Sequence, residues 1–259
     1  MHYILKYDKS IMSYFKNFSF KEIKKSVLKK IINLGTPSAM QMLFEVSLFT
    51  GAIWLSGSIG KTSQAANQIA LTLATMTFMF AMGLSVTAMI RISNQKGLND
   101  YVKLVVVAKS IFLLAILIEI IFAIFFIAFH NYLPSLFLNL ENTHQAIDNK
   151  EVIEIAAKLL MVAAVFQISD GIQVVVLGAL RGLQDVKVPM YITFVAYWII
   201  GFPISFYLGL YTELKATGIW IGLLAGLTIA AILLYIRFNK LSKRLIKEQV
   251  IAHNQIQTQ

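Results

Sequence analysis

The chain has 259 residues, of which 58% are hydrophobic and only 14% are charged. Soluble domains contain roughly 45–50% apolar and about 25% charged residues, so this composition indicates a membrane protein rather than an ordinary soluble domain. The net charge of +10 could indicate a nucleic-acid partner, but the positions of the basic residues argue against one. The absence of cysteine excludes disulfide bonds and thiolate metal sites.

The chain begins with a polar, basic stretch over residues 1–33 that lacks the apolar core of a signal peptide. Six apolar segments follow, and each matches the roughly 17–25 residues that span a ~30 Å hydrocarbon core. They are Leu34–Ser58, Ala65–Ile90, Leu104–Phe129, Ile155–Leu180, Met190–Tyr211 and Ala216–Phe238. We therefore expect an all-α membrane protein with one six-helix lobe over residues 34–238. Residues 1–33 are a predicted cytoplasmic lead-in, and residues 239–259 a predicted cytoplasmic tail.

The basic residues predict the orientation of these helices. With the N-terminus in the cytoplasm, 19 of the 23 Lys and Arg residues lie on the cytoplasmic side, counting each helix end with its nearest loop. The four on the opposite side are Lys61, Lys150, Lys158 and Lys215. This asymmetry follows the positive-inside rule. We expect both termini to be cytoplasmic, the surroundings to be lipid, and no nucleic acid to bind.

The fifth segment contains a helix breaker near its middle. Pro203 follows Gly201 closely, and Gly/Pro-interrupted segments are found in transporters at the positions where helices bend. Gly201 and Pro203 together predict a kink in this helix. The kink either contributes to function or only shapes the packing of the helices.

Two acidic residues lie near the centres of apolar segments. Glu45 belongs to the first segment, with Gln41 one helical turn away on the same face. Asp170 belongs to the fourth segment, close to Gln167 and Gln173. A charged side chain at mid-bilayer costs at least about 2.5–3.5 kcal/mol on insertion scales. The simplest use for two such groups is to bind and release a cation; the alternative is a structural hydrogen bond between helices.

The second segment adds a polar stripe, because Gln64, Gln68, Thr72 and Thr75 fall on one helical face. Lipid offers these groups no partners, so we expect the stripe to face inward and complete a pocket of carboxylate, amide and hydroxyl oxygens. Hard cations such as Na⁺ take oxygen ligands. A proton can occupy the same pocket, because a desolvated carboxyl group favours its neutral form. Composition does not separate Na⁺ from H⁺.

Other polar and aromatic residues within the segments carry a weaker signal. Glu119 lies in the middle of the third segment, but its sequence neighbours from Ile116 to Ile121 are all apolar. Tyr197 and Trp198 are interpreted as interfacial or packing residues.

Enzyme signatures are missing. There is no H-E-x-x-H motif and no P-loop, and Gly83–Thr87 lacks the last glycine of a nucleophile elbow. All four histidines lie at the edges of the apolar segments or outside them: His2, His130, His144 and His253. We do not expect an enzyme.

Several short motifs resemble the multidrug and toxic compound extrusion (MATE) family, in its NorM-like branch. The resemblance runs in order over about Leu34–Arg237. It is carried by Leu34–Pro37 (LGTP), Phe44–Val46 (FEV), Ala65–Ala70 (AANQIA), Phe166–Gln173 (FQISDGIQ), Leu180–Asp185 (LRGLQD) and Tyr191–Trp198.

The resemblance implies a fold of twelve helices in two six-helix lobes, of which this chain is similar to the second, C-terminal lobe. It also implies export of cationic, amphipathic drugs in exchange for Na⁺ or H⁺. Glu45 and Asp170 match the cation site of that lobe, and would be the metal ligands if the coupling ion is Na⁺. Phe166 stands where NorM-like relatives often have a tyrosine that joins the site, and Asn67 replaces a usual histidine.

From this resemblance we expect a multi-pass protein of the bacterial inner membrane. Gln41, Gln68, Phe166 and Gln173 are expected as neighbours of the cation site, and no cofactor other than the coupling ion is expected. The partner would be a second six-helix lobe, either an N-terminal half or another copy of this chain. Two alternatives remain: a lobe that does not transport and serves as a remnant or scaffold, and a flippase for lipid-linked substrates.

Overall fold

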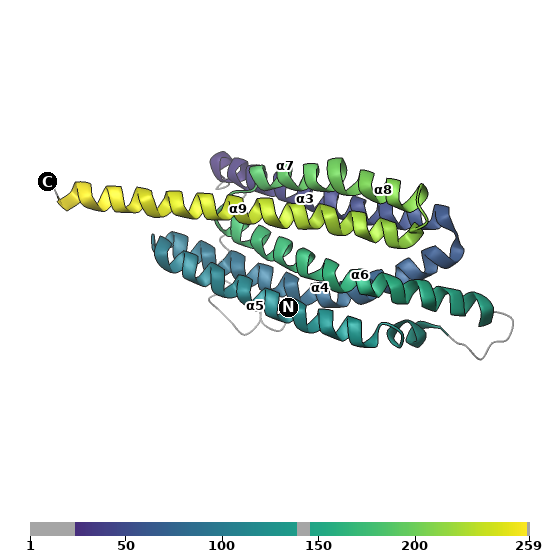
Figure 1. The fold of residues 1–259 in the computed structure, drawn as a ribbon. Coiled ribbons are helices and arrows are strands. Elements are labelled where there is room, and N and C mark those ends of the chain that lie inside the picture. Colours follow the sequence, from purple (N-terminus) through teal and green to yellow (C-terminus); the bar gives the residue numbers. More distant parts are fainter. Residues whose placement is uncertain (1–23, 139–145, 258–259) are drawn as a thin grey trace, which may run out of the picture.

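The computed structural model describes residues 24–138 and 146–257, and within these ranges six helical segments are long and apolar enough to cross a membrane (Figure 1). This confirms the all-α fold with six membrane-length helices. The elements are α3 (Lys25–Ile59), α4 (Lys61–Gly97), α5 (Tyr101–Phe129), η2 (Leu133–Phe137), α6 (Ala146–Gly182), α7 (Lys187–Phe194), η3 (Val195–Gly201), α8 (Phe202–Leu210) and α9 (Lys215–Gln257).

Helices α3 and α9 extend beyond the apolar segments that predicted them. Helix α3 already begins at Lys25, and α9 continues through Asn239 to Gln257. Most of the expected lead-in, residues 1–23, lies outside the described residues. The division into lead-in, lobe and tail stays a prediction.

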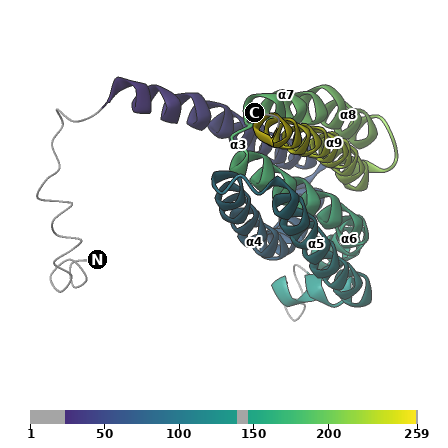
Figure 2. The same cartoon turned by 90° about the vertical axis from the view of Figure 1, so that its left-hand side faces the viewer.

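Helix α6 is the centre of the bundle. In the view along the helices, α4 and α5 lie with α6 on one side, while α3, α7, α8 and α9 lie on the other (Figure 2). Helix α6 packs against α4, α5 and α9, and it is the most buried of the six membrane-length segments, whereas α3 is the least buried. The site residues of α6 are therefore held by neighbours on several sides.

Small residues let the helices of this bundle approach closely, as is usual in membrane proteins. Gly178 of α6 lies directly against Ser85 of α4, and the Ser85 hydroxyl donates to the Val174 carbonyl across the same contact (2.7 Å). Gly201 lies against Gly226 of α9, where a Cβ atom would be 3.1 Å from the Gly226 Cα. These contacts set how far apart, and in which rotation, the helices pack.

The fifth segment is interrupted where the sequence predicts a kink. It consists of α7, then the π-helical stretch η3, and then α8, which has Pro203 in its first turn. Proline lacks a backbone N–H, and π-helical stretches occur mostly as local insertions in α-helices, often at functional sites. The interruption places Tyr197, in the middle of η3, inside the bundle.

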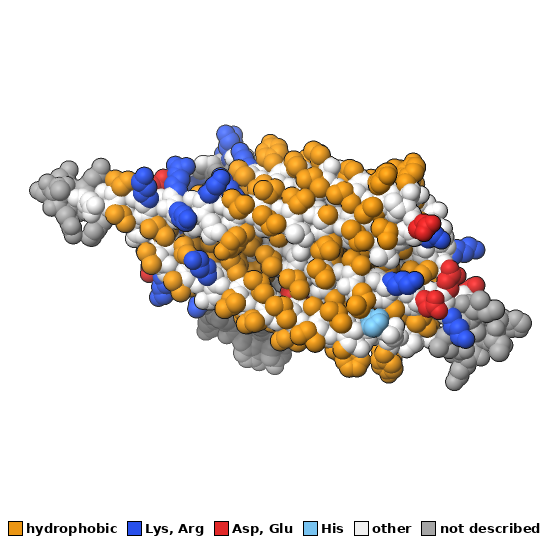
Figure 3. Space-filling model, in the orientation of Figure 1, with side chains coloured by type: hydrophobic (Ala, Val, Ile, Leu, Met, Phe, Trp, Pro, Cys, Tyr) orange, Lys and Arg blue, Asp and Glu red, His pale blue; other side chains and the backbone are white. Residues whose placement is uncertain are grey.

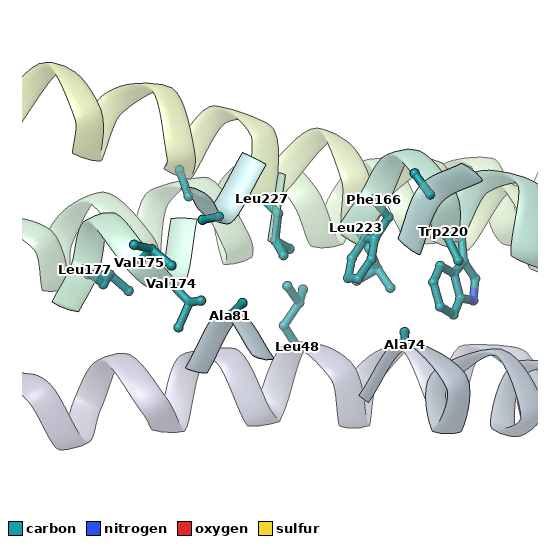
Figure 4. Packing of buried hydrophobic residues seen from close by; sticks show 14 of the residues in the cluster. Leu48, Ala74, Ala81, Phe166, Val174, Val175, Leu177, Trp220, Leu223 and Leu227 are labelled. Carbon is teal, nitrogen blue, oxygen red and sulfur yellow. The ribbon is translucent and has the colours of Figure 1, made fainter. Parts of the chain in front are cut away.

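The surface and the core are both apolar. Hydrophobic side chains form a broad band across the middle of the visible face (Figure 3), and charged side chains gather at its two ends, with Lys and Arg densest toward the C-terminus. Inside the bundle, Leu48, Ala81, Phe166, Trp220 and Leu227 point into one core (Figure 4), and each is buried. An apolar band outside an apolar core is expected where lipid replaces water.

Candidate cation-binding site

Glu45 and Asp170 come from two different helices and interact with each other. Asp170 lies on α6 with only 6% of its surface exposed, and Glu45 lies on α3 and is half-buried. The two carboxyl groups interact electrostatically. Asp170 Oδ1 has no hydrogen-bond partner in the part of the chain that the structure describes. The structure thus brings together the two acids that stood out in the sequence.

Two of the three buried glutamines of the described residues, Gln41 and Gln173, differ in what they can offer a ligand. Gln41 Nε2 donates to the Val186 carbonyl (3.1 Å), and Gln41 Oε1 accepts from Arg181 Nη2 (3.3 Å). Gln41 therefore ties α3 to the end of α6 and to the loop that follows. Gln173 is fully buried on α6, and neither of its amide atoms is paired among the described residues. Gln173 therefore has an unpaired oxygen that is available to a ligand, whereas the hydrogen bonds of Gln41 connect two helices.

The polar stripe of the second segment does not face these residues. Gln64, Gln68 and Thr75 are exposed and Thr72 is half-buried. The hydroxyls of Thr72 and Thr75 donate to carbonyls one turn back on their own helix. The prediction that this stripe turns inward is therefore wrong for this bundle, and Gln68 does not join the buried site. A face rich in small residues packs inward instead; its buried alanines are Ala66, Ala70, Ala74, Ala81 and Ala88.

Phe166 contributes packing rather than an oxygen ligand. Its ring, 2% exposed, meets Trp220 with centroids 5.2 Å apart and Phe49 with centroids 6.0 Å apart. Trp220 Nε1 in turn donates to Asn67 Oδ1 (2.9 Å), so Asn67 belongs to this aromatic cluster as well. Both positions at which the chain departs from the NorM-like pattern lie in one packed unit.

Two residues of the site were not predicted from the sequence. Tyr197 is fully buried, its hydroxyl has no partner among the described residues, and it interacts electrostatically with Glu45 and Asp170. Arg181, in the last turn of α6, interacts electrostatically with Glu45. Sequence reasoning assigned Tyr197 to packing and Arg181 to the cytoplasmic charges. The only hint was that Tyr197 lies well inside the fifth segment rather than at its edge.

Buried or half-buried oxygen atoms in this part of the bundle belong to Glu45, Asp170, Gln173 and Tyr197. Oxygen atoms are the ligands of hard cations. No group of three or more His, Cys, Asp or Glu side chains converges on a metal-sized site within residues 24–138 and 146–257. Two carboxylates and the guanidinium of Arg181 carry a net charge of −1 when all three are ionised. One monovalent cation would neutralise the site.

Comparisons with known proteins agree with this fold. The MatE family model matches residues 37–207. A probable multidrug resistance protein NorM from Agrobacterium fabrum is 36% identical over 220 residues, which is 85% of this chain and 46% of that protein. The multidrug resistance protein MdtK of Yersinia pseudotuberculosis serotype O:1b is 35% identical over 224 residues, which is 84% of this chain and 47% of that protein. The chain spans about half the length of these relatives.

Solved structures show the same architecture. An outward-facing multidrug resistance MATE family transporter superimposes with a TM-score of 0.77 and 18% identity, covering 89% of this chain and 49% of its own. The eukaryotic MATE transporter AtDTX14 gives a TM-score of 0.74 and 18% identity, covering 92% of this chain and 55% of its own. Because the family model matches more than half of the residues and the helices are long enough to cross a membrane, the chain is a multi-pass membrane protein that belongs to the MATE family, in its NorM-like branch.

Proposed function

We propose that this chain is the C-terminal lobe of a multidrug efflux antiporter of the bacterial inner membrane. It exports cationic, amphipathic compounds in exchange for Na⁺ or H⁺, and Glu45 and Asp170 bind the coupling ion. The observation that carries the proposal is Asp170 itself: it lies on α6 with 6% of its surface exposed, and its Oδ1 has no hydrogen-bond partner within the described residues.

The coupling follows from electrostatics. Two ionised carboxylates in a low-dielectric site repel each other, and a cation between them removes that repulsion. Arg181 offsets one of the two negative charges, so that the empty site carries a net charge of −1 and one bound monovalent cation makes it neutral. Helix α3 is the least buried membrane-length helix of the described chain and is therefore the element best able to move when the ion leaves.

The donor atoms support either ion. For Na⁺, the Tyr197 hydroxyl and the Gln173 amide oxygen add to the two carboxylates, so that a phenol from η3 stands in for the hydroxyl that Phe166 lacks. For H⁺, either carboxylate suffices. We keep both ions in the proposal.

The exposed polar stripe of α4 supports a second lobe as the partner. Gln64 and Gln68 lie on the surface of a segment that crosses the membrane, where lipid offers no hydrogen bonds. A second six-helix lobe would cover this stripe or leave it lining an aqueous substrate path. That lobe is either an N-terminal half or another copy of this chain, arranged with both termini of this chain in the cytoplasm.

The test is ion-driven efflux of a cationic dye from right-side-out membrane vesicles loaded with the dye. The cells express this chain together with any six-helix reading frame directly upstream of Met1, and an imposed Na⁺ or H⁺ gradient drives transport. Glu45→Gln and Asp170→Asn should each reduce efflux at least about tenfold, because removing a charge from the pair leaves the ion unbound. Glu213→Gln, at an exposed position between α8 and α9, is the matched control and should transport normally.

Normal efflux by both Glu45→Gln and Asp170→Asn would refute the assignment. If no vesicle preparation shows efflux and purified chain binds neither ion, the chain is a scaffold or remnant lobe. If vesicles translocate a fluorescent lipid-linked substrate instead of the dye, the flippase alternative replaces the antiporter.

A further inference from the structure

Glu119 is a third acidic residue within the six apolar segments, and less of its surface is exposed than that of Glu45. It lies in the middle of α5 with 1% of its surface exposed. Its sequence neighbours are apolar, but α6 supplies polar surroundings: Gln167 Nε2 donates to the Glu119 backbone carbonyl at 3.4 Å. The polar contact that the sequence neighbours of Glu119 do not provide therefore comes from α6.

Gly171 creates the space that the Glu119 side chain occupies. A Cβ atom at Gly171 would lie 2.6 Å from Glu119 Cγ and 3.0 Å from Glu119 Oε1. The carboxyl group thus rests directly on the backbone of α6, beside the residue that follows Asp170. Glu119 and Asp170 interact electrostatically, which links α5 to the cation site.

One oxygen of the Glu119 carboxyl group lacks a hydrogen-bond donor. Glu119 Oε2 is buried and has no partner in the part of the chain that the structure describes. A protonated carboxyl group carries an O–H donor that a carboxylate lacks. A proton on the Glu119 carboxyl group would remove its charge, whereas a metal ion would need several more oxygen ligands than one carboxyl group provides.

No cation balances the charge of Glu119. Neither salt bridge within residues 24–138 and 146–257 involves it. Helices α4, α6 and α9 pack against α5. Away from the charged residues near their ends, α4 carries no titratable side chain and α6 carries Asp170. Helix α9 carries Tyr235, whose ring centroid lies 6.0 Å from that of Phe112. Phe112 is about two helical turns before Glu119 on α5. The ionised form of Glu119 thus meets desolvation and a like charge, and both disfavour it.

We propose that Glu119 binds an exchangeable proton as an ion-binding group separate from the Glu45–Asp170 pair. The use of that proton in transport rests on the proposed function, but its binding does not. With Arg181 offsetting one of the three carboxylates, these four groups would carry −2 when ionised, so that they take up two monovalent cations rather than one. One cation binds at the Glu45–Asp170 pair and the other is the proton on Glu119.

Infrared spectroscopy of the full chain in lipid nanodiscs tests this inference without any transport. The C=O stretch of protonated carboxyl groups is recorded while the pH is raised from about 5 to about 9, a range that covers strongly desolvated carboxyl groups. Glu119→Gln should remove one titrating component of this band. Glu213→Gln, at an exposed site, is the matched control and should leave the components of buried groups unchanged. A Glu119→Gln spectrum identical to that of the unmodified chain throughout the titration would overturn the proposal.

Two further variants keep the outcome decisive. If Glu119→Gln loses its helical amide bands, Glu119→Asp is measured in its place. The shorter carboxyl group cannot rest on Gly171 in the same way, so its C=O component should shift in frequency. An unshifted component would count against the proposal. The double variant Glu45→Gln/Asp170→Asn should retain the Glu119 component. Loss of that component from the double variant would show that Glu119 is not an independent site, while the efflux assay separately decides the role of the pair.

Discussion

Replacing Gly178 by alanine should force α4 and α6 apart at one of their closest contacts. The added Cβ would lie 2.5 Å from Ser85 Oγ and 2.8 Å from the Ser85 carbonyl carbon, and even closer to its carbonyl oxygen. A side chain could rotate out of the way, but the backbone of a membrane helix cannot. The helices must therefore separate or rotate, and the hydrogen bond from Ser85 Oγ to the Val174 carbonyl is strained or lost.

The expected cost is the balance of three contributions. Overpacking of a close contact costs about 1–3 kcal/mol, and loss of one hydrogen bond between membrane helices adds about 0.6 kcal/mol. The greater helix propensity of alanine returns about 0.5–1 kcal/mol. Gly178→Ala should therefore lower the free energy of unfolding by about 1–3 kcal/mol.

Gly83 provides the matched control because a Cβ there meets nothing within 4 Å. It lies on the same helix as Ser85, so Gly83→Ala should be neutral or stabilising by up to about 1 kcal/mol. Both variants are unfolded by adding SDS to mixed micelles, with helix content followed by circular dichroism. The reasoning is refuted if Gly178→Ala unfolds at the same SDS fraction as the unmodified chain, or if Gly83→Ala is equally destabilised.

Two more predictions use the same SDS titration. Trp220→Phe keeps the ring contact but leaves the buried Asn67 Oδ1 without its donor, so the free energy of unfolding should fall by about 1–3 kcal/mol; an unchanged midpoint would contradict the role given to this bond. Arg237→Gln should destabilise the chain by about 1 kcal/mol, since its 2.7 Å ion pair with the largely buried Asp185 joins α9 to the loop after α6. Arg244→Gln breaks an exposed pair within α9 and should leave the SDS midpoint essentially unchanged, so equal losses from the two arginine variants would count against this ranking.

The amino-acid sequence by itself determined the membrane class, the six helices and the two acids of the candidate site. Lipid forces each spanning segment to satisfy its own backbone hydrogen bonds, so a long apolar run has a single outcome, an α-helix, wherever it occurs. The depth of Glu45 and Asp170 follows directly from their positions within such runs. These inferences depend on distances along the chain, and those distances do not change when the helices pack.

The tertiary structure alone decided which face of each helix points inward. The polar stripe of α4 predicted a rotation that the structure does not show; the small residues of α4 pack inward instead, with Ser85 directly against Gly178, and Gln68 lies on the surface. The π-helical stretch η3 carries Tyr197 into the site, and Gly171 opens the space that Glu119 fills. Each of these outcomes depends on how close two backbones come, which is a property of residues far apart in the sequence and not of any local motif.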